Sequence, residues 1–406
     1  MENYIVCETM RKNLFPFAMV LCGLCACTPS APFNTIEGEV AGLKVGDRIV
    51  LAVGTLTQTP VVVDSVTVSR DGFFTLTTLA SDTYATLLLL HKGDTLDPDR
   101  NPSAGIFLEG FSRLKLRGDV ENWYFMKASG GLYDLPQMKG LIALTDSAQT
   151  IQRQRHALLN RSREYAALEG HDPDSLKRMR DRGMELLNVS GEILDRRDTL
   201  ERELVLQNPD LAYSAEVLHY DYQTMKDFDR YDSVFRTLTP RVQATPAGKA
   251  VADYIAAVRA TEVGNVAPDF ALPDINGEML RLSNLRGRYV LLDFWGSWCG
   301  PCRASIPSLA ALYDKLKGKN FELISIAIDE PDDDRWRETV TEEKMTWRHL
   351  NDRLSAPGEE FRLRYAIMGV PACFLIDPEG RIALKGHPME ILSEVERIVL
   401  AREKEN

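Results

Sequence analysis

The feature that most constrains this chain is a pair of cysteines, with two residues between them, at the junction of a buried strand and a helix. Residues 289–294 form a near-continuous apolar run, which is typical of a strand buried on both faces. Cys299-Gly300-Pro301-Cys302 follows, and a stretch with helical character continues through Lys317. A Cys-x-x-Cys pair at the start of a helix, directly after a strand, indicates thiol redox chemistry.

The helix start also explains why the first cysteine is expected to react. Unpaired N–H groups and the positive end of the helix dipole favour a thiolate at Cys299, and Arg303 adds a positive charge nearby. Pro301 suits the first helical turn because it has no N–H to lose. We expect Cys299 to be the exposed nucleophile and Cys302 to be the buried cysteine that resolves the mixed disulfide.

Strand and helix patterns alternate through the rest of this part of the chain. The apolar runs at 321–328 and 372–376 predict two more buried strands, and 381–385 predicts another after the turn at 377–380. The sequence around the cysteine pair, from Phe294 to Cys302, resembles the thioredoxin active-site signature. The flanking sequence resembles the membrane-anchored, exported thioredoxin-like reductases of the TlpA and ResA type. This resemblance implies an α/β thioredoxin fold over residues 262–402 and thiol–disulfide oxidoreductase activity without a cofactor.

The resemblance also implies roles for individual residues. Asp293 matches the buried acid that accepts a proton from the second cysteine, although a hydrogen-bonded structural carboxylate is the alternative. Val370-Pro371 matches the cis-proline loop that pairs with substrate backbone, although a trans proline at a strand edge is the alternative. Pro307 matches the proline inside the active-site helix. The implied docking surface consists of Trp298, Gly300, Pro301 and Val370.

Two positions depart from the family pattern. Ser305 stands where reductases dedicated to cytochrome c maturation commonly have a Glu, which weakens an assignment to that pathway. Cys373 is not part of the pattern, and we expect a small buried residue that fills space. A zinc site would need two ligands besides the cysteine pair, and only Cys373, His349 and His387 remain, without ligand spacing. We therefore predict no metal.

The N-terminus has the features of a targeting segment. Arg11 and Lys12 precede the apolar run 14–26, which is too short to span a bilayer. The run ends in Leu24-Cys25-Ala26-Cys27, which resembles a bacterial lipobox. We predict a lipoprotein signal peptide over residues 1–27 and a lipid on Cys27, which would hold the protein on the periplasmic side of a membrane. An ordinary signal peptide is the alternative.

Residues 34–130 are expected to form a small antiparallel all-β domain. Short runs such as 49–51, 61–63, 73–76 and 87–90 are rich in residues that favour sheets, and Asp71-Gly72 predicts a hairpin. The pattern resembles the β module of unknown function that often precedes thioredoxin domains in exported bacterial proteins.

Residues 131–260 are expected to be helical. Leu, Ala, Arg, Glu and Gln dominate, with apolar residues spaced by three and four, and breaks are predicted at 208–210 and 238–240. A spacer, a dimerisation element and a substrate platform all fit this pattern.

Charge excludes one class of partner. The net charge is -11 at pH 7, without the clustered Lys and Arg that a polyanion requires, so we predict no nucleic-acid partner. The expected partners are disulfide-containing exported proteins and a membrane dithiol that donates electrons. Two alternatives remain. One is a ligand- or partner-binding lipoprotein with an accessory redox domain. The other is a thioredoxin-fold peroxidase, which would need a Thr where Gly296 stands.

Overall fold

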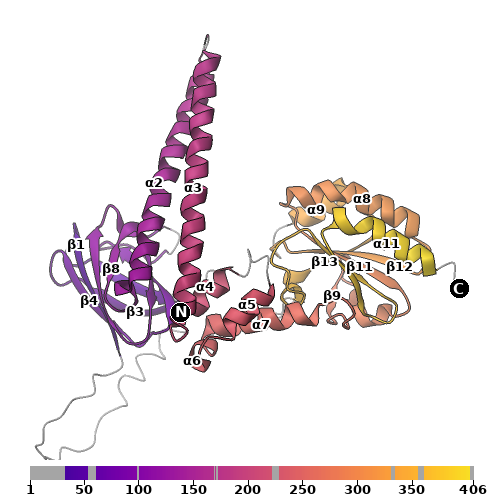
Figure 1. Ribbon diagram of the computed structural model, residues 1–406, viewed down its shortest axis with the longest axis horizontal. Helices are drawn as coiled ribbons and strands as arrows, with labels where there is room; N and C mark the ends of the chain where they lie inside the picture. The colour runs from indigo at the N-terminus through magenta and orange to yellow at the C-terminus, as the bar shows by residue number, and fades with distance from the viewer. Residues whose placement is uncertain are drawn as a thin grey trace, which may run out of the picture.

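The computed structural model describes residues 33–53, 61–97, 100–168, 170, 172–221, 228–330, 334–354 and 361–402. Along the chain these residues form a β region, a helical region and a C-terminal α/β region (Figure 1), which confirms the predicted fold class. The predicted signal peptide, with Cys27, lies outside the described residues. Among the helices that are described, none is both long and apolar enough to cross a membrane.

The β region consists of two four-stranded sheets around an apolar core. One sheet has the order β4-β1-β7-β8 and the other has the order β3-β2-β5-β6. The pairs are antiparallel except for β1 and β7, which run parallel. Alternate side chains of β4 are buried because one face of its sheet covers the core. The strands are β1 (Asn34–Ala41), β2 (Arg48–Val53), β3 (Val61–Thr67), β4 (Phe73–Thr78), β5 (Thr83–Leu90), β6 (Ser103–Leu108), β7 (Arg113–Asp119) and β8 (Lys127–Ser129).

The predicted hairpin at Asp71-Gly72 is wrong. Gly72 has a φ of 80° and the chain does turn there, but β3 and β4 belong to different sheets. The carboxylate of Asp71 accepts a hydrogen bond from the N–H of Val45, and the N–H of Gly72 donates to the carbonyl of Leu43. The turn is therefore held by the loop after β1 and passes the chain from one sheet to the other.

The helical region contains a long two-helix hairpin. Two short 3-10 helices, η1 (Trp123–Phe125) and η2 (Gly131–Asp134), precede α2 (Pro136–Ala166) and α3 (Pro173–Gln207). The carboxylate of Asp172 caps α3 by accepting from the N–H groups of Asp174 and Ser175. α2 and α3 pack along each other and project away from the β sheets (Figure 1). The remaining helices of this region are α4 (Ala212–Asp221), α5 (Phe228–Phe235), α6 (Pro240–Gln243) and α7 (Pro246–Ala260).

Specific contacts join neighbouring regions. Both carboxylate oxygens of Glu109, just after β6, accept hydrogen bonds from the N–H groups of Ala212 and Tyr213 at the start of α4. Arg241 of α6 forms ion pairs with Asp82 and Glu109. At the other end, the side chain of Asn265 donates to the carbonyl of Arg259 in α7.

The C-terminal region is built on a five-stranded sheet with the order β13-β12-β11-β14-β15. β11, β12 and β13 run parallel, whereas β14 and β15 are antiparallel to their neighbours. All seven residues of β11 are buried because this central strand is covered on both faces. The elements are β9 (Ala271–Pro273), β10 (Met279–Arg281), η3 (Leu282–Leu285), β11 (Tyr289–Trp295), α8 (Gly300–Leu316), β12 (Phe321–Ala327), α9 (Arg335–Glu342), β13 (Arg348–Asn351), η4 (Asp352–Leu354), α10 (Phe361–Arg364), β14 (Ala372–Ile376), β15 (Ile382–Gly386) and α11 (Pro388–Arg402).

Two apolar clusters cover the faces of this sheet. One packs residues of α8, α9 and α11 against one face, and the other packs residues of β9, β10 and α10 against the opposite face. β11 ends directly before α8, so the end of the central strand carries the cysteine pair to the N-terminus of a helix.

Candidate redox site

Cys299 and Cys302 form a disulfide at the start of α8, with an S–S distance of 2.01 Å. Cys299 caps the helix, and its Sγ accepts a hydrogen bond from the N–H of Cys302 at 3.2 Å. Both cysteines are buried, with exposed fractions of 4% and 2%. The expectation of an exposed Cys299 is therefore wrong for the disulfide form. Its sulfur is bonded to Cys302 on one side and lies 3.7 Å from the carbonyl oxygen of Val370 on the other.

The loop opposite the disulfide is the one expected from the sequence. The peptide bond between Val370 and Pro371 is cis, and the carbonyl of Val370 faces the sulfur of Cys299. Trp298 is 60% exposed beside the disulfide, and Gly300 and Pro301 are also exposed. These three exposed residues therefore border the buried disulfide.

Gly296 is a residue that the sequence analysis used only to argue against a peroxidase. A Cβ on Gly296 would come within 2.8 Å of the Trp298 indole. A side chain at this position would therefore displace Trp298 from its place beside the disulfide.

Asp329 is a second residue of the site that the sequence analysis missed. Its buried carboxylate accepts hydrogen bonds from the N–H and the hydroxyl of Ser297 and so fixes the turn between β11 and α8. In the sequence, Asp329 is recognisable as an acid directly after the second buried strand. Its contact with Ser297, 32 positions away, becomes apparent only in the fold.

Arg303 does not present a free positive charge to the cysteines. Its guanidinium forms ion pairs with Glu343 at 2.8 Å and Glu342 at 3.7 Å. Two carboxylates next to one guanidinium offset its charge. The help that the sequence analysis expected from Arg303 in stabilising a thiolate is therefore weaker than predicted.

Asp293 lies in the middle of β11 and is 2% exposed. Its Oδ2 accepts a hydrogen bond from the hydroxyl of Ser325 at 2.8 Å, and its Oδ1 lies 3.5 Å from the thiol of Cys373. Burial raises the pKa of Asp293 to about 6, against the opposing effect of these two donors. A carboxyl group with this pKa is mostly ionised near pH 7 and can still accept a proton from a neighbouring thiol.

Asp293 belongs to a row of buried polar side chains that crosses the sheet. His349 on β13 pairs in register with Ser325 on β12, Ser325 pairs with Asp293 on β11, and Asp293 pairs with Cys373 on β14. The indole N–H of Trp347 donates to the hydroxyl of Ser325 at 2.8 Å. Cys373 is buried, as expected, but its thiol bonds to Asp293 rather than merely filling space. The sequence signal was a polar or thiol side chain within the apolar runs of β11, β12 and β14.

Ser305 and Pro307 lie in α8. The hydroxyl of Ser305 is buried and donates to the carbonyl of Cys302 at 2.7 Å, so the position at which relatives can have an acid makes a local helix contact here. Pro307 is inside the helix, as expected.

No group of three or more Cys, His, Asp or Glu with metal-binding geometry is found among the described residues. His349 is buried, and its Nε2 lies 3.2 Å from the carbonyl of Met345. Burial lowers the pKa of His349 to about 4, so this imidazole is neutral at pH 7. His387 accepts a hydrogen bond from the N–H of Met389.

The fold and the site define a class of protein, a thioredoxin-fold protein with a redox-active disulfide at the N-terminus of a helix. A model of the AhpC/TSA family matches residues 263–385. The thiol–disulfide oxidoreductase ResA of Bacillus cereus is 32% identical over 129 residues, which cover 32% of this chain and 72% of the relative. ResA of Geobacillus kaustophilus is 33% identical over 129 residues, which cover 30% of this chain and 68% of the relative.

This chain belongs to the thioredoxin-like family of ResA-type thiol–disulfide oxidoreductases, and it has thiol–disulfide oxidoreductase activity. Among solved structures, the thioredoxin domain of a thiol-disulfide oxidoreductase from Bacteroides vulgatus is 31% identical. That match covers 34% of this chain and 98% of the solved domain, with a TM-score of 0.32.

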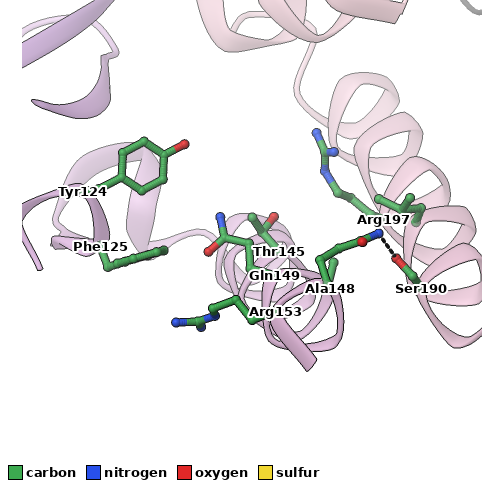
Figure 2. A pocket seen from close by; sticks show the side chains of 10 residues that line it. Tyr124, Phe125, Thr145, Ala148, Gln149, Arg153, Ser190 and Arg197 are labelled. Carbon is green, nitrogen blue, oxygen red and sulfur yellow. Dashed lines mark hydrogen bonds between the residues drawn. The ribbon is translucent and has the colours of Figure 1, made fainter. Parts of the chain in front are cut away.

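A separate hollow lies between η1 and the α2–α3 hairpin. Its volume is about 450 Å³, and Tyr124 and Phe125 of η1 face α2 across it (Figure 2). Arg153 of α2 lies over the ring of Phe125, and Arg197 of α3 forms an ion pair with Glu201. This pocket contains no thiol and lies outside the residues that the family model matches.

Proposed function

We propose that this protein is a lipid-anchored reductase on the periplasmic side of a bacterial membrane, where it reduces disulfides of exported proteins. One observation carries the proposal: the Cys299–Cys302 disulfide lies between the cis-Pro371 loop and a helix N-terminus, in the same buried cluster as Cys373, the partner of Asp293. The cysteine pair supplies an electrophile when oxidised and a nucleophile when reduced. The Pro371 loop supplies a docking edge, and Asp293 supplies a proton acceptor.

The proposed reaction starts from the reduced pair. The Cys299 thiolate attacks a substrate disulfide, forms a mixed disulfide and releases the first substrate thiolate. Asp293 takes the proton of Cys302, whose thiolate then attacks the sulfur of Cys299. The second substrate thiolate leaves and the Cys299–Cys302 disulfide forms, so two electrons have passed to the substrate. The helix N-terminus stabilises each thiolate at position 299.

We propose reduction rather than oxidation because little here stabilises the reduced thiolate strongly. Gly300-Pro301 is the dipeptide found in thioredoxin, whose potential is about -270 mV. Arg303 is occupied by Glu342 and Glu343, and an ionised Asp293 opposes a second negative charge. Equilibration of the full chain against defined thiol buffers tests this direction. A potential above about -180 mV, the value of protein disulfide isomerase, would contradict it.

The proposed location rests on the sequence motif that ends at Cys27. A lipid on that residue would anchor the protein, and a membrane dithiol would have to return electrons to the pair. Cys27→Ser is expected to move the protein from the membrane fraction to the soluble fraction of lysed cells. An equal share in the membrane fraction for both forms would contradict lipid anchoring.

The peroxidase alternative has no support at the site, since Gly296 stands where the required Thr would be and the cysteine pair is joined within one helical turn.

The binding alternative has one observation in its favour, the pocket beside Tyr124 and Phe125. If that pocket holds protein substrates, Phe125→Ala will slow the reduction of a protein disulfide and leave the reduction of glutathione disulfide unchanged. Equal rates on both substrates for the variant and the wild type would exclude a substrate-docking role for this pocket.

A further inference from the structure

The carboxylate of Asp293 is held from both sides by neighbouring strands. In-register pairing places Ser325 of β12 on one side and Cys373 of β14 on the other. Side chains in register on adjacent strands point to the same face of a sheet, so the three groups meet on one face. The register therefore gives each carboxylate oxygen its own donor.

The contacts have a direction. The indole N–H of Trp347 donates to the oxygen of Ser325 at 2.8 Å, and the hydroxyl of Ser325 donates to Oδ2 of Asp293 at 2.8 Å. Since Trp347 occupies the hydroxyl oxygen as a donor, the hydrogen of Ser325 is free for the carboxylate. The thiol of Cys373 donates to Oδ1 at 3.5 Å.

Cys373 is suited to donate and unsuited to react. Burial, together with the neighbouring Asp293, raises the pKa of the Cys373 thiol well above its ordinary value. The thiol therefore keeps its proton at neutral pH, and it is the thiolate that reacts with disulfides. It is also 0% exposed.

We propose that Ser325 and Cys373 are positioning residues that hold the two oxygens of the Asp293 carboxylate, keep its ionised form hydrogen-bonded and so set the pH range in which Asp293 accepts a proton. This inference rests on the proposed function because it assumes that Asp293 serves Cys302.

Apart from burial, hydrogen bonds are what act on the pKa of Asp293 in its surroundings. The titratable group in contact with Asp293 is the thiol of Cys373 on β14. Cys302 on α8 belongs to the same cluster as Cys373 but is held in the disulfide, and the row continues to His349 on β13, which is neutral. α11 contributes apolar side chains to this cluster, among them Ile391, Val395 and Val399. Within the described part of the chain, burial, Ser325 and Cys373 are what act on the pKa of Asp293.

The test is a titration of the Asp293 carboxyl in the full-length oxidised protein, followed by carbon-13 NMR, with the Asp293→Asn variant to assign the signal. Cys373→Ala and Ser325→Ala each remove one donor to the ionised form, so each midpoint should move upward, by about one pH unit. Trp347→Phe, which leaves both donors in place, should move the midpoint less than Ser325→Ala does. Cys373→Ser restores an O–H donor and should return the midpoint most of the way to the wild-type value.

The same variants are then compared in the pH profile of disulfide reduction. The acidic limb of the profile should move to higher pH in Cys373→Ala, by the amount seen in the titration. In the Asp293→Asn background, Cys373→Ala should leave the position of the profile unchanged. Midpoints that stay at the wild-type value in both Cys373→Ala and Ser325→Ala would overturn the inference. If one of these variants fails to fold, the other still decides. Shifted midpoints in a protein that reduces no disulfide would refute the proposed function and leave the positioning role intact.

Discussion

Two buried polar side chains, Asn34 in the β region and Asp293 in the C-terminal region, offset the free-energy cost of their burial in different ways. The amide of Asn34 donates to the carbonyls of Ala80 and Gly110 and accepts from the N–H of Ser112. It is neutral, and its partners include three backbone groups that lie between strands. Asp293 is ionisable, and its hydrogen bonds come from the side chains of Ser325 and Cys373.

The difference indicates a structural role for Asn34 and a chemical role for Asp293. Asn34 contributes to stability because it supplies hydrogen-bond partners to three backbone groups. Asp293 costs stability at neutral pH because burial raises the pKa of a group that is then charged. A fold keeps such a costly group where its proton affinity is used. By this criterion the buried polar groups of the β region and of the C-terminal region have different roles, and the following predictions test that contrast.

The largest effect is expected at the cysteine pair. Cys299→Ser should lower disulfide reduction by about a thousandfold or more, because no nucleophile remains. Cys302→Ser should lower turnover equally and accumulate mixed disulfides on Cys299, visible as a mass increase on non-reducing gels. The serine variant at position 299 is the matched control, since a protein that traps partners without Cys299 would contradict the assigned order.

The second effect is a loss of stability in the β region. Asn34→Ala leaves two carbonyls and one N–H without their partner, which should lower the free energy of unfolding by about 3 kcal/mol. Chemical denaturation followed by circular dichroism measures this loss. The redox potential should not change. A change in potential would mean that the two regions are coupled more tightly than their contacts indicate.

The third effect has the opposite sign. The folded-state pKa of Asp293 is about 6 against an ordinary value of 3.8, so the folded protein binds more protons than the unfolded chain between these values. Stability contributed by this group is therefore lost as the pH rises from about 4 to 6. Asp293→Asn should raise the free energy of unfolding above pH 7, by up to about 3 kcal/mol, and make no difference near pH 3. Equal stability of the wild type and Asp293→Asn at pH 8 would show that Asp293 does not lower stability, which would contradict the contrast with Asn34.

The fourth effect is a change in the pH dependence of stability and concerns His349, which opposes Asp293 over the same pH range. Its pKa is lowered from 6.5 to about 4, so the unfolded chain binds the extra proton there and stability rises with pH. The slopes of the two groups nearly cancel in the wild type. In Asp293→Asn the rising slope of His349 should be uncovered between pH 4 and 6. The measurement is the unfolding midpoint in urea at half-unit pH steps, and an unchanged slope would show that His349 titrates normally.

The sequence predicted those parts of the site that lie close together in the chain. Cys299, Cys302 and Asp293 are within ten positions of one another, and the cis bond before Pro371 was expected from the resemblance. The contact between Cys373 and Asp293 joins residues 80 positions apart, and it depends on the antiparallel pairing of β11 and β14. The hairpin expected at Asp71-Gly72 failed for a related reason. A turn sequence fixes the local backbone but does not decide which strand becomes the neighbour.

The parallel pairing of β1 with β7 has a consequence for how the chain folds as it is synthesised. β1 needs both β4 and β7 as neighbours, and the contact between Asn34 and Ser112 spans 78 positions. At about 5–20 residues per second, the ribosome needs several seconds to deliver β7 after β1 has emerged. During that interval one edge of β1 is open while its apolar residues Ile36 and Val40 await their core. The α2–α3 hairpin closes from neighbouring segments, whereas β1, the first strand of the described residues, is completed only when β7 has been made.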